Sequence, residues 1–448
     1  MAAVQVPSAG NVSGSAADEA LFSKVSWHLL PLLFVCYVIA FLDRINIGFA
    51  QLQMKQSLPF SDEAYALGAG IFFIGYFLFE VPSNLMLEKI GARKTLLRIM
   101  FCWGLCAAGM MFVQTTTQFY ILRFLLGAFE AGFFPGIILY LTYWYPSARR
   151  CKAIAIFMTA ASFAYLIAGP VSGAIMKYMD GMAGYRGWQW LFLVQGLPAS
   201  FLGIYAYFYL KDKPEQANWL TDGEKALLRQ HLDNDPHAAP AQSHGSLWSM
   251  LADPRVYMLS LVYFLLLGAT YTMVFWVPTL IRQWGIADVM TIGLLAALPA
   301  LFGMIGMVLI GRSSDKNLER RWHFFICAAI AAAGLLMSIL AQGSLVGSLA
   351  GICILAIGQS AATPILFTGV SQYLPPRLAA GGIALISSLG NLGAAAFPPI
   401  TAYINKATGA PVMSMYLVTA LYLVSGAIFL YILRPMKAPS GAVAAPAT

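Results

Sequence analysis

The chain has 448 residues, of which 59% are hydrophobic and only 10% are charged, whereas a soluble globular protein carries roughly 25% charged residues. So much apolar sequence excludes a soluble fold and predicts that lipid surrounds most of the chain. The net charge is +8, but the basic residues lie at the ends of apolar segments rather than on one continuous face, so nucleic acid is not an expected partner.

Twelve apolar segments are each long enough to cross about 30 Å of hydrocarbon, which takes about 20 helical residues. They lie near 27–50, 64–86, 94–114, 118–142, 152–176, 188–210, 255–280, 290–311, 322–342, 346–371, 378–402 and 412–434. We predict an all-α polytopic membrane protein with twelve transmembrane helices in two pseudo-symmetric six-helix bundles. The expected units are an N-terminal tail (1–26), a first bundle (27–210), a linker (211–253), a second bundle (254–434) and a C-terminal tail (435–448).

The distribution of Lys and Arg in the short loops predicts the orientation of the chain. The loops after the second, fourth, eighth and tenth segments hold twelve basic residues, and the remaining short loops hold five. Since basic loops remain on the cytoplasmic side, both termini and the linker are expected on the cytoplasmic side of a bacterial inner (plasma) membrane.

Five charged residues fall within the predicted spans, namely Asp43, Arg44, Glu80, Arg123 and Glu130. A charge at the bilayer centre costs at least ~2.5–3.5 kcal/mol, so each needs a partner or a function. Arg123 and Glu130 are seven residues apart, which is two turns on one helix face. We expect four of these groups to face a central cavity, with Glu80 paired to the basic loop nearby. A structural ion-pair cluster between the first and fourth spans is the alternative.

This charge set suggests how an anion and a proton could be coupled. A substrate carboxylate competes for an arginine, and the acid that loses its partner takes up a proton. Glu130 is the first candidate for the proton carrier and Asp43 the second. Arg44 and Arg123 are the predicted anion binders, because a guanidinium matches a carboxylate in bidentate geometry.

An internal repeat supports the two-bundle division. In the loops after the second and eighth spans, an acid is followed five residues later by a basic pair that begins at Arg93 after Glu88 and at Arg320 after Asp315. Both loops resemble the G-x-x-x-D-R-x-G-R-R motif of the major facilitator superfamily, although Asn84 replaces its first glycine. The resemblance implies that these four charged residues form a cytoplasmic gate. Topology signals alone are the alternative, but they do not explain the acids.

Further motifs resemble the anion:cation symporter family of that superfamily, and the likeness extends from about residue 25 to residue 434. They lie at 41–50, 79–84, 123–136, 143–146, 187–192 and 382–393. The chain looks most similar to bacterial tartrate transporters and the related phthalate and hydroxyphenylacetate permeases. The resemblance implies uptake of a small carboxylate with protons, a proton-linked pair at Asp43 and Glu130, and cavity positions at Tyr76 and Asn391.

Three positions depart from the family pattern, namely Gln195 in place of Glu, Phe367 in place of Trp and Ser387 in place of Asn. The last two are expected to line the cavity. In the second half, Tyr271 and Trp276 are further candidates for substrate contact, with interfacial anchoring as the alternative.

The predicted function is therefore import of a small organic anion with protons, by a monomer. A tartrate-like hydroxy or dicarboxylic acid and an aromatic acid all remain open as substrates, and an anion exchanger or efflux carrier is the alternative. An enzyme is not expected, because the five histidines lie at segment ends, in loops or in the linker. No metal or cofactor is expected, and the six cysteines are interpreted as packing residues.

Overall fold

The computed structural model describes residues 16–235, 253–373 and 376–433. Within these ranges every regular element is a helix, and twelve helical segments are long and apolar enough to cross a membrane. The prediction of an all-α protein with twelve spans is confirmed. Residues 1–15 of the predicted N-terminal tail, residues 236–252 of the linker and the whole predicted C-terminal tail lie outside the described residues.

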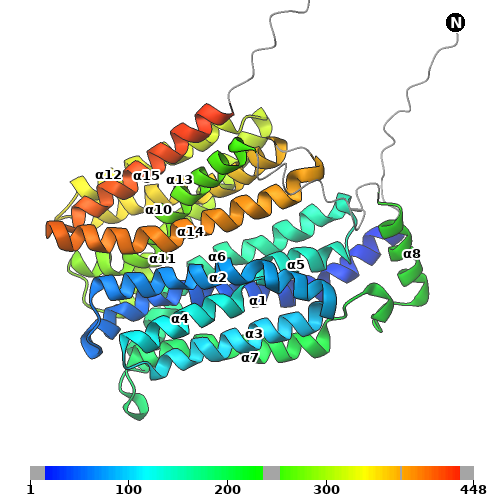
Figure 1. Ribbon diagram of the computed structural model, residues 1–448, viewed down its shortest axis with the longest axis horizontal. Helices are drawn as coiled ribbons and strands as arrows, with labels where there is room; N and C mark the ends of the chain where they lie inside the picture. Colours follow the sequence, from blue (N-terminus) through cyan, green and yellow to red (C-terminus); the bar gives the residue numbers. More distant parts are fainter. Residues whose placement is uncertain (1–15, 236–252, 374–375, 434–448) are drawn as a thin grey trace, which may run out of the picture.

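The helices form two bundles that lie side by side (Figure 1). The first bundle contains α1 (Ala16–Ser57), α2 (Asp62–Ile90), α3 (Ala92–Gly109), α4 (Thr116–Glu130), α5 (Phe133–Thr142), α6 (Ser147–Tyr178) and α7 (Gly187–Tyr209). The second contains α10 (Pro254–Gln283), α11 (Val289–Asn317), α12 (Arg321–Leu340), α13 (Leu345–Tyr373), α14 (Pro376–Thr408) and α15 (Pro411–Ile432). Between them in sequence, α8 (Asp222–Asp233) packs beside the start of α1.

The fourth span consists of two helices, because the backbone breaks between α4 and α5. Gly132 has φ +86°, a left-handed conformation that favours glycine, and a Cβ there would lie 2.4 Å from Ser83 Oγ. The break makes Glu130 the last residue of α4 rather than a residue in mid-helix. The acid therefore sits at a helix end deep inside the bundle.

The two bundles meet through α2 with α14, α6 with α11, and α1 with α10. Arg282 Nη1 donates to Leu52 O at 2.5 Å, and ion pairs join Lys177 to Asp288 and Lys406 to Glu63, at 2.8 Å and 2.9 Å. All these groups lie near the loops that follow α1, α6, α10 and α14. We call this end of the protein the closed end.

The backbones of α6 and α11 approach each other closely where these helices cross. A Cβ on Gly169 would lie 2.2 Å from Gly293 O, and a Cβ on Gly293 would lie 2.2 Å from Gly169 O. Only residues without a side chain allow the two helices to approach this closely.

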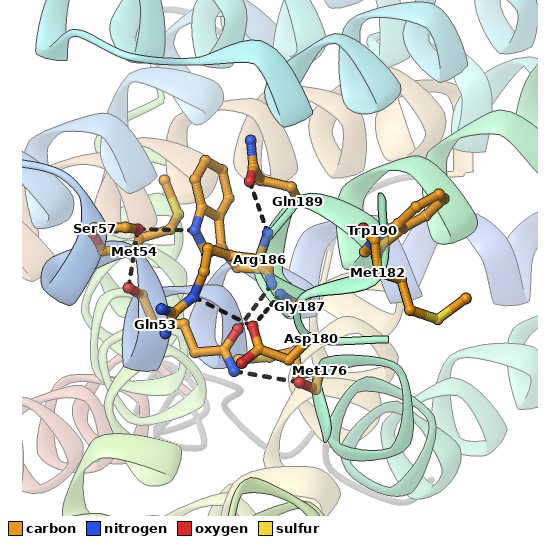
Figure 2. A network of polar contacts seen from close by, with 11 residues as sticks. Gln53, Met54, Ser57, Met176, Asp180, Met182, Arg186, Gly187, Gln189 and Trp190 are labelled. Carbon is orange, nitrogen blue, oxygen red and sulfur yellow. Dashed lines mark hydrogen bonds and ion pairs between the residues drawn. The ribbon is translucent and has the colours of Figure 1, made fainter. Parts of the chain in front are cut away.

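Polar contacts also fix the closed end within the first bundle (Figure 2). Gln53 accepts from the backbone of Trp188 at 2.9 Å, and the Trp188 indole donates to Ser57 Oγ at the same distance. Asp180 accepts from Gly187 N at 2.7 Å and pairs with Arg186 at 3.2 Å. These contacts satisfy N–H groups at the start of α7, which the helix itself leaves unpaired, and so hold α1, α6 and α7 in register.

Candidate functional site

Arg44 and Glu130 form an ion pair between α1 and α4. Arg44 Nε donates to Glu130 Oε1 at 2.5 Å. The Glu130 side chain is completely buried, whereas 13% of the Arg44 side chain is exposed. Arg44 is therefore the member of this pair that a ligand can reach.

Aromatic rings surround the Arg44 guanidinium. Its Cζ lies 5.0 Å from the centre of the Tyr76 ring, 5.5 Å from Phe41 and 5.7 Å from Phe72. The Tyr271 phenol of α10, in the second bundle, is also within electrostatic reach of Arg44. Cation–π contact orients a guanidinium while leaving its N–H groups free to bind an acceptor. The structure thus places Arg44 where the two bundles face each other.

Asp43 lies next to Arg44 in sequence but has different surroundings. Its Oδ2 accepts from the Trp103 indole of α3 at 2.5 Å, and its Oδ1 accepts from Asn46 at 3.3 Å. The residue is only 1% exposed. Consecutive helical residues point about 100° apart, which explains why one side chain reaches the core of the first bundle and the other its inner face.

Arg123 is buried between α2 and α4. Its Nε donates to Gly68 O at 3.1 Å and its Nη2 to Ala69 O at 3.4 Å, while its Cζ lies 4.9 Å from the Phe72 ring. Nη1 is a buried atom without a hydrogen-bond partner among the described residues. Phe72 thus stands between the two arginines, and Arg123 retains one donor for a further acceptor.

The second bundle contributes aromatic side chains opposite this cluster. Tyr271 packs on Phe73 of α2 with ring centres 4.6 Å apart, and Tyr263 packs on Phe367 of α13 at 4.9 Å. Asn391 follows Gly390 in α14, and a Cβ on Gly390 would lie 2.1 Å from the Tyr263 ring. Tyr271 therefore lies where α10 meets α2, and Phe367 packs beside Tyr263 within the second bundle.

This geometry, with two bundles, buried charges in one and aromatic residues in the other, agrees with the comparison to known proteins. The sequence profile of the Major Facilitator Superfamily matches residues 33–398, with a second match over 286–447. The chain belongs to the Major Facilitator Superfamily. It is a membrane transporter and not an enzyme.

Relatives within the superfamily cover nearly the whole chain. A "Putative tartrate transporter" of Agrobacterium vitis is 44% identical over 93% of this chain and 92% of its own. A "Quinolone resistance transporter" of Acinetobacter baumannii is 39% identical over 93% and 95%. Among solved structures, a D-xylose-proton symporter covers 92% of this chain and 98% of its own with a TM-score of 0.74. Its sequence identity of 14% means that this last likeness shows the superfamily fold alone.

The predicted gate residues of the superfamily loops make contacts within their own bundles. Arg93 donates from its backbone to Asp212 at 2.9 Å and from Nε to Tyr207 O at 2.8 Å. Arg320 pairs with Asp315 at 2.7 Å. The Glu88 side chain lies outside the described part of the chain. In this conformation, the other three gate candidates are thus not brought together across the two bundles.

Trp276 lies apart from the Arg44 cluster, at the closed end. Its ring is 5.1 Å from Lys55 Nζ and packs on Tyr65 with ring centres 6.0 Å apart. It lines a cavity of about 410 Å³ that also contacts Glu63 and Lys406. Gln195, one of the departures from the family pattern, donates to Ser172 at 3.2 Å between α7 and α6.

Glu80 differs most from its sequence-based interpretation. It is 9% exposed, and its Oε2 accepts from Ser388 Oγ of α14 at 2.7 Å, so its hydrogen-bond partner belongs to the other bundle. Pairing with the nearby basic residues is wrong for this structure, because Arg98 bonds Ser83 at 2.5 Å and Arg93 bonds the end of α7. The sequence shows Glu80 as a charged residue within a span. It does not show the partner of Glu80, because Ser388 is 308 residues away in sequence.

Proposed function

We propose that this transporter imports a small organic anion together with protons, by alternating access across the bacterial inner membrane. The anion is a tartrate-like hydroxy or dicarboxylic acid, or an aromatic acid. The observation that carries the proposal is the Arg44–Glu130 pair, in which the cation is reachable and the acid is fully buried. The relative named for tartrate supports the carboxylate class.

The first step is exchange of the partner of Arg44. A substrate carboxylate accepts from the guanidinium in bidentate geometry and displaces Glu130. Glu130 is then a buried carboxylate without its counter-ion, which is a costly state that binding of a proton relieves. One anion and one proton thus enter the site together, and release of both restores the original pair. Asp43 is the second candidate for the proton, and Arg123 offers its unpaired Nη1 as a second donor.

The residues around Arg44 suit a carboxylate on a small organic body. The Tyr76 ring lies beside the guanidinium, and Tyr271, Phe367 and Asn391 belong to the facing bundle. Rings of this kind pack against a flat or short carbon skeleton, while phenol and amide groups bind substrate hydroxyls.

Orientation follows from the excess of basic residues in the loops opposite the closed end. With both termini in the cytoplasm, the closed end faces outward and the conformation is one in which the site communicates with the cytoplasm. The gate residues, which now contact groups in their own bundles, would meet in the alternate conformation.

Uptake into proteoliposomes tests the proposal. A panel of radiolabelled carboxylates, including tartrate, phthalate and hydroxyphenylacetate, is offered with and without an inward proton gradient. Accumulation of one member only with the gradient is expected. Glu130→Gln is expected to lower gradient-driven accumulation while retaining exchange of internal for external substrate, because the acid is needed for coupling and not for binding. Gradient-driven accumulation by Glu130→Gln at the wild-type level would refute the assignment.

An exchanger or efflux carrier on the same scaffold is the second candidate, and the relative named for quinolone resistance favours it. In the same vesicles, uptake that ignores the gradient but requires an internal anion identifies an exchanger. Proton-driven movement of a quinolone without movement of any carboxylate identifies an efflux carrier.

A further inference from the structure

Among the described residues, Glu80 makes the polar contact between the two bundles that lies farthest from the closed end. It is 18 residues beyond Asp62, the first residue of α2, which places it about 27 Å along the helix from the closed end at 1.5 Å per residue. Its contact with Ser388 crosses between α2 and α14. In the described part of the chain, the other hydrogen bonds and ion pairs that join the bundles lie much nearer the closed end, as at Glu63 and Lys177. Glu80 is thus a carboxylate of the first bundle that contacts the second bundle far from the closed end.

The groups that face Glu80 come from four helices. Ser388 of α14 donates to it, Arg44 of α1 acts on it through space, and the phenols of Tyr76 on its own helix and Tyr263 of α10 are also within electrostatic reach. Arg44 is in direct contact with Glu130, not with Glu80. Among the described residues, therefore, no ion pair within 4.0 Å neutralises Glu80.

The charge of the buried set is unbalanced. The set contains three acids (Asp43, Glu80 and Glu130) and two arginines (Arg44 and Arg123), so full ionisation leaves one negative charge in excess. An uncompensated charge in a low-dielectric interior is costly, and binding of a proton removes the excess. Binding of an anionic substrate adds a further negative charge and increases the proton affinity of the buried acids.

We propose that Glu80 is a further proton-binding residue of the transport site, in addition to the acid that loses Arg44. This inference rests on the proposed function. The proton comes from water on the side to which the site is open and adds to the Glu80 carboxylate, and the Ser388 hydroxyl can then accept a hydrogen bond instead of donating one. Because Ser388 belongs to the second bundle, the protonation state of Glu80 alters a contact between the moving parts.

The proton-to-substrate ratio tests the inference. Proteoliposomes with the membrane voltage clamped at zero accumulate radiolabelled tartrate against an imposed gradient of one pH unit. Each coupled proton multiplies the limiting accumulation about tenfold under that gradient. Glu80→Gln keeps the shape of the side chain and a hydrogen bond to Ser388 but cannot bind the proton. It is expected to accumulate about tenfold less tartrate than the wild type, whereas Glu80→Asp, which keeps a carboxyl group, restores the wild-type limit.

The outcomes separate the two proposals. Wild-type accumulation by Glu80→Gln overturns the role of Glu80 and leaves the proposed function intact. If the proton gradient does not change uptake of any carboxylate of the panel by the wild-type protein, both the proposed function and the role of Glu80 are overturned. If Glu80→Gln does not exchange tartrate, proton uptake on tartrate binding to the purified protein decides: one proton fewer per site supports the inference, and an unchanged number overturns it.

Discussion

The indole nitrogen of Trp103 lies 2.5 Å from Asp43 Oδ2, inside the first bundle and away from the exposed part of Arg44. The two acids of the central cluster therefore have different neighbours: Asp43 is held by neutral donors and Glu130 by a cation. A ligand that binds Arg44 removes the partner of Glu130 directly and leaves the donors of Asp43 in place. Under the proposed function, Glu130 is therefore the acid that responds first to substrate.

Trp103→Phe tests the role of the indole donor. The substitution leaves a buried carboxylate short of one hydrogen bond, which is expected to destabilise the protein by about 1–3 kcal/mol. Thermal melting of the purified protein in detergent measures the loss. In the Asp43→Asn background the same substitution is expected to cost less, because the charge that needs the donor is gone. Equal costs in both backgrounds would show that the indole contributes packing alone.

Arg44→Lys and Arg123→Lys are expected to fail in different ways. Arg44 is the reachable arginine, so loss of its bidentate contact is expected to weaken substrate binding by about 1.5–3 kcal/mol, or about 10- to 100-fold in KM. Arg123 bonds the carbonyl groups of Gly68 and Ala69, so its replacement is expected mainly to lower the melting temperature. Uptake kinetics and thermal melting of both variants make the comparison. The reverse pattern would move the anion site to Arg123.

Gly132→Ala is expected to disturb the break that ends α4. A left-handed conformation costs about 1–2 kcal/mol for a residue with a side chain, and the new Cβ would meet Ser83 Oγ. Both thermal stability and uptake are expected to fall, because Glu130 is only two residues away. Gly181→Ala is the matched control: Gly181 also has positive φ, but nothing lies within 4 Å of its added Cβ. A similar loss in both variants would assign the effect to backbone conformation alone.

Gly293→Ala is expected to weaken the closed end. Its Cβ would lie 2.2 Å from Gly169 O, so α6 and α11 must separate. Spin labels on the exposed residues Tyr178 and Ala287, which leave the Lys177–Asp288 pair intact, measure the distance between the bundles, and a longer mean distance is expected in the variant. Gly311→Ala, in the same helix but with open space around its Cβ, serves as the control. An unchanged distance in Gly293→Ala would mean that the helices adapt without separating.

The ion pair between Lys177 and Asp288 is expected to persist across the working range of a proton gradient. The hydrogen bond from Lys177 holds the pKa of Asp288, which lies outside the spans, at about 2, below its ordinary value of 3.8. A lowered pKa contributes stability that is fully present above the ordinary value and is lost as the pH falls toward about 2. Between about pH 5 and pH 8 the pair therefore stays ionised. Asp288→Asn is expected to leave the shape of the pH–uptake curve unchanged, and a shifted curve would implicate this pair in coupling.

The sequence predicted most of the fold because lipid imposes a strong and local rule on span length and charge. The number of spans and the two-bundle architecture are confirmed. The interruption of the fourth span escaped prediction, since the predicted segment 118–142 is apolar throughout the break at Gly132. The first helix begins at Ala16 rather than near 27, because its polar start packs on α8, a tertiary contact that hydropathy does not report.

The sequence identified the charged residues of the spans but not their partners. A charged residue inside a span is visible in any sequence, which is why Asp43, Arg44, Arg123 and Glu130 could be named as candidates. Which acid contacts which arginine depends on side-chain direction at the helix crossings. The cross-bundle contact of Glu80 depends in addition on how two halves of the chain assemble, so no local pattern signals it.

The docking of α8 on α1 fixes the first part of the linker to the first bundle. Lys24 pairs with Glu224 at 2.8 Å, and His231 contacts Asp18 at the same distance, so this part of the linker belongs mechanically to the first bundle. The covalent tether between the bundles is thereby shortened to the stretch after Asp235, and the noncovalent crossings of α2 with α14 and α6 with α11 must guide their rocking. If the chain is cut within that stretch, the two fragments should still associate in the membrane and form a complete transporter.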